Sequence, residues 1–229
     1  MRGWLDRWSA INGSPSHLLP PLSELPPATE EMPDRSITAY SFDRLVVCQT
    51  DEVAQMLIAN NFHFENNCAI LSISGYPQRI FDTTMQMLRR NPELRVFAFH
   101  DCSPEGIELA SRLRSDPRWF PDESIPIIDV GLSIRQILAS KRDVFMRASK
   151  ASIEASLALN PRVRQNLSKE ELEWLGAGNF VELESFTPRT LIRVLQRSIA
   201  NSRALESIEE NNLILLGDSG SMYSIDSFG

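Results

Sequence analysis

The sequence predicts an α/β fold: a Rossmann-like, four-stranded, mainly parallel sheet with flanking helices, followed by a helical C-terminal part. Between residues 44 and 130, short apolar runs alternate with segments whose apolar residues have helical spacing. This alternation is typical of βαβ units, which build a parallel sheet with right-handed crossovers. After residue 131 the helical spacing continues without further strand-like runs.

Each element follows from its residues. Four buried strands are expected at the apolar runs 44–48, 68–74, 95–100 and 125–130. Three helices are expected between them, at 51–61, 77–91 and 103–116. Pro77 suits the first turn of the second helix, and Ser103 with Pro104 suits the N-cap and first residue of the third.

The chain is expected to divide into four parts. Residues 1–43 form a proline-rich N-terminal arm, in which "WLDRW" favours a short helix. We expect such an arm to wrap its own domain or to dock on a protein partner. Residues 44–131 form the α/β core, and residues 132–210 form a helical C-terminal part of the same domain. Residues 211–229 end in "GDSGSMYSIDSFG", which is polar and rich in Gly and Ser, and are expected to be a flexible tail.

Composition restricts the class of protein. Among the 229 residues no apolar run approaches the roughly 18 that a membrane span needs, and no signal peptide is evident. The three cysteines lack metal-ligand spacing and are expected to be reduced, which predicts a cytoplasmic protein. The net charge of −7 argues against a general nucleic-acid coat.

Basic residues are nevertheless concentrated after the predicted sheet. Residues 131–169 are locally basic, and three further arginines recur every four residues on one face of the last helix. These clusters indicate either a solvated surface or a contact with DNA or an acidic partner. The candidate binding residues are Arg135, Lys141, Arg142, Arg189, Arg193 and Arg197.

Polar residues follow the ends of the predicted strands. Asp101 comes directly after the third strand, Gln49 and Asp51 follow the first, and Asp129 lies near the end of the fourth. Ligands of parallel sheets bind beyond the carboxyl ends of the strands, so Asp101, Asp51 and Asp129 are candidate ligands for Mg²⁺. The alternative is that Asp101 only marks the strand end. Glu182 and Glu184 are either further site acids or solvated residues.

The segment Asp101-Cys102-Ser103-Pro104-Glu105-Gly106 resembles the D-x-D-P-x-G motif of the Toprim domain. The resemblance is to the Toprim type found in the topoisomerase VI A subunit, the meiotic double-strand-break transesterases and the nuclease subunit of Wadjet-type anti-plasmid systems. "VVCQTDEVAQML" is similar to the family's V-E-x-E-x-V-F-x-x-L, with Asp51 at its second acid. "EWLGAGNFVELESFTPRTLIRVLQRSI" is similar to a later family segment, so the resemblance covers about residues 44–200.

Two family acids are replaced in this chain. Gln49 takes the place of the Glu after the first strand, and Ser103 takes the place of the second Asp. The resemblance therefore implies a Toprim-like subunit of a DNA-processing, anti-plasmid or anti-phage complex that binds Mg²⁺ weakly or not at all and acts by binding and scaffolding. One alternative is an active Mg²⁺-dependent nuclease using Asp101 and Asp51. Another is a receiver-like signalling domain phosphorylated at Asp101.

Overall fold

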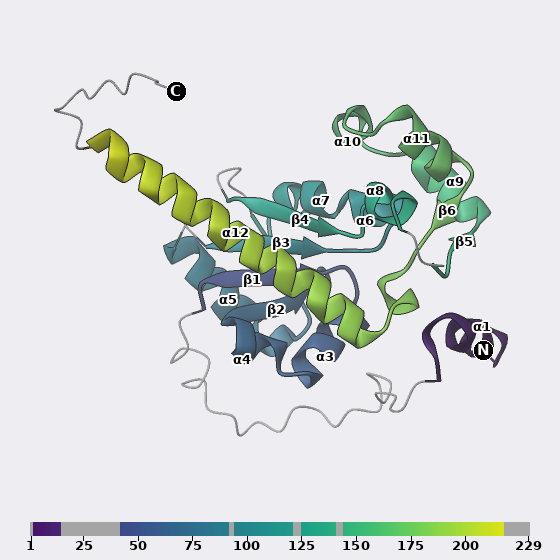
Figure 1. Cartoon of the computed structure of the whole chain (residues 1–229), viewed down its shortest axis with the longest axis horizontal. Helices are drawn as coiled ribbons and strands as arrows, with labels where there is room; N and C mark the ends of the chain where they lie inside the picture. The colour runs from purple at the N-terminus through teal and green to yellow at the C-terminus, as the bar shows by residue number, and fades with distance from the viewer. Residues whose placement is uncertain (1, 15–41, 92–93, 121–124, 141–143, 218–229) are drawn as a thin grey trace, which may run out of the picture.

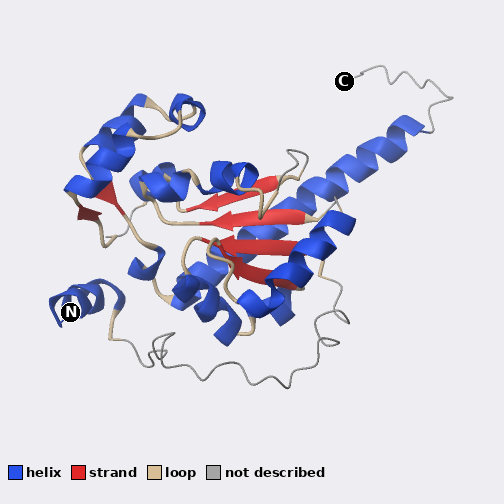
Figure 2. Ribbon diagram, turned by 180° about the vertical axis from the view of Figure 1, so that it is seen from behind, coloured by secondary structure: helices blue, strands red, loops and turns tan. Residues whose placement is uncertain are grey.

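A computed structural model of the chain shows a four-stranded sheet covered by helices on both faces (Figure 2). The structure describes residues 2–14, 42–91, 94–120, 125–140 and 144–217. All four strands run parallel, in the order β2-β1-β3-β4, which confirms the predicted fold class. Their bounds are β1 Arg44–Cys48, β2 Cys68–Ser72, β3 Arg95–Phe99 and β4 Ile127–Gly131.

Alternate residues of the central strands point into two separate cores, as the strand period of two requires. Val46 and Phe97 pack in one core, and Leu45 and Val96 pack in the other. Both faces are therefore buried, which explains why β1 reads as a continuous apolar run rather than an alternating one.

The crossovers between the strands are helical, with local differences from the prediction. The predicted helix 103–116 is two helices that meet at Glu108, and a further short helix follows the first crossover. Pro77 is the N-cap of its helix and lies outside it. The crossover helices are α3 Asp51–Ala59, α4 Phe62–Asn66, α5 Gln78–Arg90, α6 Pro104–Ile107 and α7 Leu109–Ser115.

The C-terminal part is helical as expected, but it also holds a short antiparallel strand pair that the sequence did not indicate. Its last helix, α12, runs from Pro188 to Gly217 and so includes residues 211–217, which we assigned to the tail. Residues 218–229 lie outside the described residues. The other elements are α8 Ile134–Leu138, β5 Arg147–Ala148, α9 Lys150–Leu157, α10 Pro161–Gln165, α11 Lys169–Gly176, β6 Asn179–Phe180 and a 3-10 turn at Leu183–Ser185.

Helix α12 covers the first of the two cores. Leu191, Leu195 and Ile199 are buried there, one turn apart along the helix. Figure 1 shows α12 crossing this face with its N-terminal end at the carboxyl edge of the sheet. None of the described helices is both long enough and apolar enough to cross a membrane.

The N-terminal arm begins with a helix, α1 Arg2–Asn12, that packs on its own chain. Trp8 is buried and its indole Nε1 donates a hydrogen bond to the carbonyl of Glu184, at 2.7 Å. The side-chain amide of Asn12 donates to the carbonyl of Ser185 at 2.8 Å. The arm thus holds the 3-10 turn near the sheet edge, whereas residues 15–41 lie outside the described residues.

Candidate functional site at the carboxyl edge of the sheet

The site is formed where β1 and β3 end side by side. Cys48 pairs with Phe99 in the last register position of the two strands. The backbone N–H of Gln49 donates to the carbonyl of Phe99 at 2.9 Å, which extends the ladder by one residue. The first residues after the two strands are therefore held together, and Gln49 lies beside Asp101.

The side chain of Gln49 serves the backbone of this edge. Its amide oxygen accepts a hydrogen bond from the backbone N–H of Asp101, at 2.8 Å. This bond fixes how the chain leaves β3, because Asp101 lies beyond the last strand residue. The amide oxygen is the atom of Gln49 best suited to bind a cation, and it already accepts this hydrogen bond.

Ser103 has a similar structural role. It is the N-cap of α6, with φ −141° and ψ 162°, and its hydroxyl oxygen accepts from the backbone N–H of Gly106 at 3.1 Å. Pro104 follows as the first helical residue, where its missing N–H has no cost. The predicted helix start is thus confirmed, and it accounts for Ser103 without a ligand.

Gly106 allows the helix to approach the strand end closely. A β-carbon placed on it would lie 2.1 Å from the carbonyl oxygen of Asp101 and 2.8 Å from the side-chain oxygen of Gln49. The first atom is backbone and cannot move aside cheaply. The Gly of the "SPEG" segment is therefore required by packing at the site itself.

Asp101 ties a distant segment to the sheet. It is 7% exposed, and its Oδ1 accepts a hydrogen bond from the backbone N–H of Leu183 at 2.7 Å. The next residue, Cys102, forms an isolated antiparallel bridge with Val181 through both backbone bonds, at 2.9 and 3.0 Å. The 181–185 segment, which the family resemblance includes but does not place beside Asp101, is thus the direct partner of Asp101.

The electrostatic surroundings oppose ionisation of Asp101. Burial is the main cause and the nearby Glu184 adds to it, so the pKa of Asp101 rises to about 7 despite the hydrogen bond from Leu183. Burial also raises the pKa of Glu184, whose Oε1 accepts from the Thr50 hydroxyl at 3.0 Å. Glu182 is instead paired with Arg147 at 2.6 Å. Glu184 therefore belongs to this edge, and Glu182 forms a surface ion pair.

Asp51 is directed toward β2 and away from Asp101. Its Oδ1 accepts hydrogen bonds from the hydroxyls of Ser72 and Ser74, at 2.5 and 2.7 Å. Both serines lie at the end of β2, which is the edge strand beside β1. Asp51 thus closes the β2 end of the sheet.

Asp129 is bound to His100, a residue that the sequence analysis did not single out. Oδ1 of Asp129 lies 2.8 Å from His100 Nε2 and accepts from the Gly131 N–H at 2.8 Å. Burial opposes the ionisation of Asp129, but these two contacts outweigh it and lower its pKa. His100 Nδ1 lies 2.7 Å from the carbonyl oxygen of Asp101, so both ring nitrogens face acceptors.

These hydrogen bonds show whether the side chains at this edge of the sheet could bind a metal ion. Mg²⁺ requires oxygen ligands in octahedral geometry, preferably charged. The three positions that correspond to acids of the Toprim motifs are 49, 101 and 103. The side chains at 49 and 103 are neutral, and one side-chain oxygen at each of the three positions accepts a hydrogen bond from a backbone N–H. Within the part of the chain that the structure describes, no three His, Cys, Asp or Glu side chains form a group that could hold a metal. The donor set does not fit Mg²⁺, and the structure does not gather Asp51, Asp101 and Asp129 into one site.

The predicted basic residues lie on separate elements. Arg135, on α8, pairs with the buried Glu171 at 3.1 Å and thereby fastens α8 to α11. Lys141 and Arg142 lie outside the described residues. Arg189, Arg193 and Arg197 are exposed along α12, on the side opposite its buried leucines.

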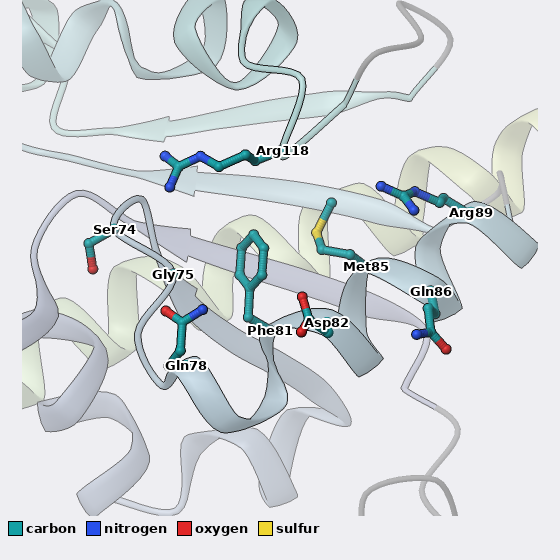
Figure 3. Close-up of a pocket in the computed structure, with 9 residues that line it drawn as sticks. All are labelled: Ser74, Gly75, Gln78, Phe81, Asp82, Met85, Gln86, Arg89 and Arg118. Carbon is teal, nitrogen blue, oxygen red and sulfur yellow. The ribbon is translucent and has the colours of Figure 1, made fainter.

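A cavity of about 420 Å³ opens on the other face of the sheet. Figure 3 shows Phe81 and Met85 of α5 within it and Arg118 extending over it from the loop after α7. Arg118 is paired with Asp116 at 3.0 Å. The cavity includes Ser74, which binds Asp51, but none of the candidate site residues lines it.

Comparison with known proteins agrees with this geometry. The family model for the Toprim domain of Spo11 and of the A subunit of topoisomerase 6 matches residues 45–117. The match begins in β1 and ends just after α7, so it includes Gln49, Asp101, Ser103 and Gly106. No curated protein matches the chain. Residues 45–117 of this chain are therefore similar to the Toprim domain of the topoisomerase 6/Spo11 type, the resemblance that the sequence motifs indicate.

Proposed function

We propose that this chain is a non-cleaving Toprim-type subunit of a DNA-processing complex, such as an anti-plasmid or anti-phage system, and that it acts by binding and scaffolding. One observation carries the proposal. The side-chain oxygens at the two replaced acid positions, Gln49 and Ser103, each accept a backbone N–H that holds the carboxyl edge together. These replacements have become part of the structure of the edge.

The charges around Asp101 support the same proposal. A carboxyl group whose pKa is raised to about 7 is a poorer ligand for a hard cation than an ionised one. The buried side chain of His100 also contributes, since its ring lies between the Asp101 carbonyl and Asp129. The protein thus stabilises this edge with hydrogen bonds between its own residues.

The alternative functions receive less support. An active nuclease based on Asp101 and Asp51 would need both carboxylates on one ion, and Asp51 is instead bound by Ser72 and Ser74. A receiver-like domain would need an accessible phosphoacceptor, and Asp101 is buried. Binding of a protein partner by the N-terminal arm remains part of the proposal, together with binding of DNA.

The proposal is tested by a cleavage assay. The purified chain is incubated with supercoiled and linear DNA in the presence of Mg²⁺ or Mn²⁺, beside the Asp101→Ala variant. We expect no cleavage by the wild type above the level of the variant, because no described group of carboxylates can hold the ion. Metal-dependent nicking that disappears in Asp101→Ala would show that the chain is an active nuclease.

A further inference from the structure

The outer face of α12 carries a row of arginines that the fold itself does not use. Arg189, Arg193 and Arg197 are exposed, whereas Leu191, Leu195 and Ile199 on the opposite side are buried against the sheet. No ion pair links these three arginines to a described residue. Their positive charge is therefore available to a partner.

The local charge contrasts with that of the whole chain. The net charge is −7, yet residues 188–202 contain three arginines and no Asp or Glu. Neighbouring arginines are four residues apart, so each guanidinium is about 6 Å further along the helix than the last, and the row extends over about 12 Å. One DNA strand places about three phosphates along that distance. Arginine also presents a planar fork that matches phosphate oxygens.

The same face lacks what a protein partner would use. Protein–protein interfaces have an apolar core surrounded by a polar rim. Among the described side chains, the large exposed apolar ones lie on other elements, and none is in the 188–202 part of α12. A charged face without apolar anchors suits a contact made through phosphates.

We propose that Arg189, Arg193 and Arg197 form a contact surface for the phosphate backbone of DNA. This inference rests on the proposed function and names the surface through which the protein holds DNA. The row begins at the carboxyl edge of the sheet and runs away from it along α12 (Figure 1). Binding here would not depend on Asp101, Gln49 or Ser103.

The test compares two triple variants of the full chain that change the same number of charges. The row variant is Arg189→Gln/Arg193→Gln/Arg197→Gln. The control is Arg90→Gln/Arg112→Gln/Arg114→Gln, which alters exposed arginines of α5 and α7, the helices that cover the opposite face. Binding of a fluorescent duplex of about 20 base pairs, long enough to exceed the row, is measured by anisotropy at low and at moderate salt. Unchanged Tm values verify that both variants are folded.

We expect the row variant to lose at least about tenfold in affinity at low salt. We also expect its log–log salt dependence to be shallower by about 2 to 3, because each lost phosphate contact removes about 0.9 from the slope. The control should bind like the wild type. Equal losses in both variants, wild-type affinity in the row variant, or no duplex binding by the wild type would each overturn the inference. So would displacement of the duplex by polyglutamate at equal charge concentration, which would indicate an acidic protein partner.

The outcomes separate this inference from the proposed function. If the wild type and the row variant bind DNA equally well, the proposed arginine surface is wrong, whereas the proposed non-cleaving function is unaffected. If the wild type cleaves DNA with a metal and the row variant loses affinity, the proposed non-cleaving function is wrong, whereas the proposed arginine surface is supported.

Discussion

Gly106→Ala is expected to destabilise the folded chain by about 3 kcal/mol or more, at the upper end of what overpacking costs. The added β-carbon would lie 2.1 Å from the carbonyl oxygen of Asp101, so either α6 or the end of β3 must move. Such a movement also disturbs the hydrogen bond from Asp101 to Gln49, because the same β-carbon would lie 2.8 Å from the Gln49 oxygen. Chemical denaturation monitored by circular dichroism measures the effect.

Gly176→Ala is the matched control. Gly176 is the last residue of α11, and no atom outside its own helix lies within 4 Å of the position that its β-carbon would take. Alanine favours the helical conformation more than glycine does. The free energy of unfolding of this variant should therefore equal that of the wild type or exceed it by up to about 1 kcal/mol. Equal effects of the two substitutions would contradict the close packing that we describe between α6 and Asp101.

Asp101→Asn is expected to gain stability relative to the wild type as pH rises. The folded pKa of Asp101, about 7, is above the ordinary value of 3.8, so the folded state binds this proton more tightly than the unfolded chain. That contribution to stability is complete below about pH 4 and is lost as pH rises through 7. Between about pH 5 and pH 8 the variant should therefore gain about 2–3 kcal/mol over the wild type, since one pKa unit corresponds to about 1.4 kcal/mol. Urea unfolding across this pH range measures the gain.

Asp101→Ala separates the charge from the hydrogen bond. Both variants lack the carboxyl group, but only Asn keeps an oxygen that can accept from the Leu183 N–H. A buried N–H without a partner costs on the order of 1–3 kcal/mol, so Ala should be less stable than Asn by about 2 kcal/mol at every pH. If Asn and Ala were equally stable, Asp101 would not be holding the 181–185 segment. A pH-independent difference between Asn and the wild type would contradict the raised pKa.

The strands of this fold were predictable because they are buried on both faces. A five-residue apolar run such as "RLVVC", directly followed by a segment with helical spacing, favours a buried strand. The division of helix 103–116 was not predictable from the local pattern, which is helical throughout. It occurs at Glu108, whose carboxylate accepts from the backbone N–H of Asn160, 52 residues away. Long-range contacts of this kind leave no local trace in the sequence.

The candidate site, like the fold, was predictable where it depends on local sequence and not where it depends on long-range contacts. The location of Asp101 and Gln49 at the carboxyl ends of strands followed from the βαβ pattern, and the N-cap role of Ser103 followed from the Ser-Pro pair. That β1 and β3 are neighbours, which brings the two residues together, was not predicted from the sequence. The sequence did not indicate that Leu183 is the hydrogen-bond donor to Asp101, because 82 residues separate them. Nor did it indicate His100, a single histidine at a strand end that gave no sign of its two acceptors.

The central claim is that the oxygens at positions 49, 101 and 103 hold the sheet edge together and do not bind a metal. Calorimetric titration of Mg²⁺ and Mn²⁺ into the wild type tests it most directly, with Gln49→Glu/Ser103→Asp beside it. That variant restores both carboxylates while keeping an acceptor at each position. We expect no heat of binding for the wild type up to millimolar ion and measurable binding by the double variant. Stoichiometric binding by the wild type that is lost in Asp101→Asn would contradict the claim.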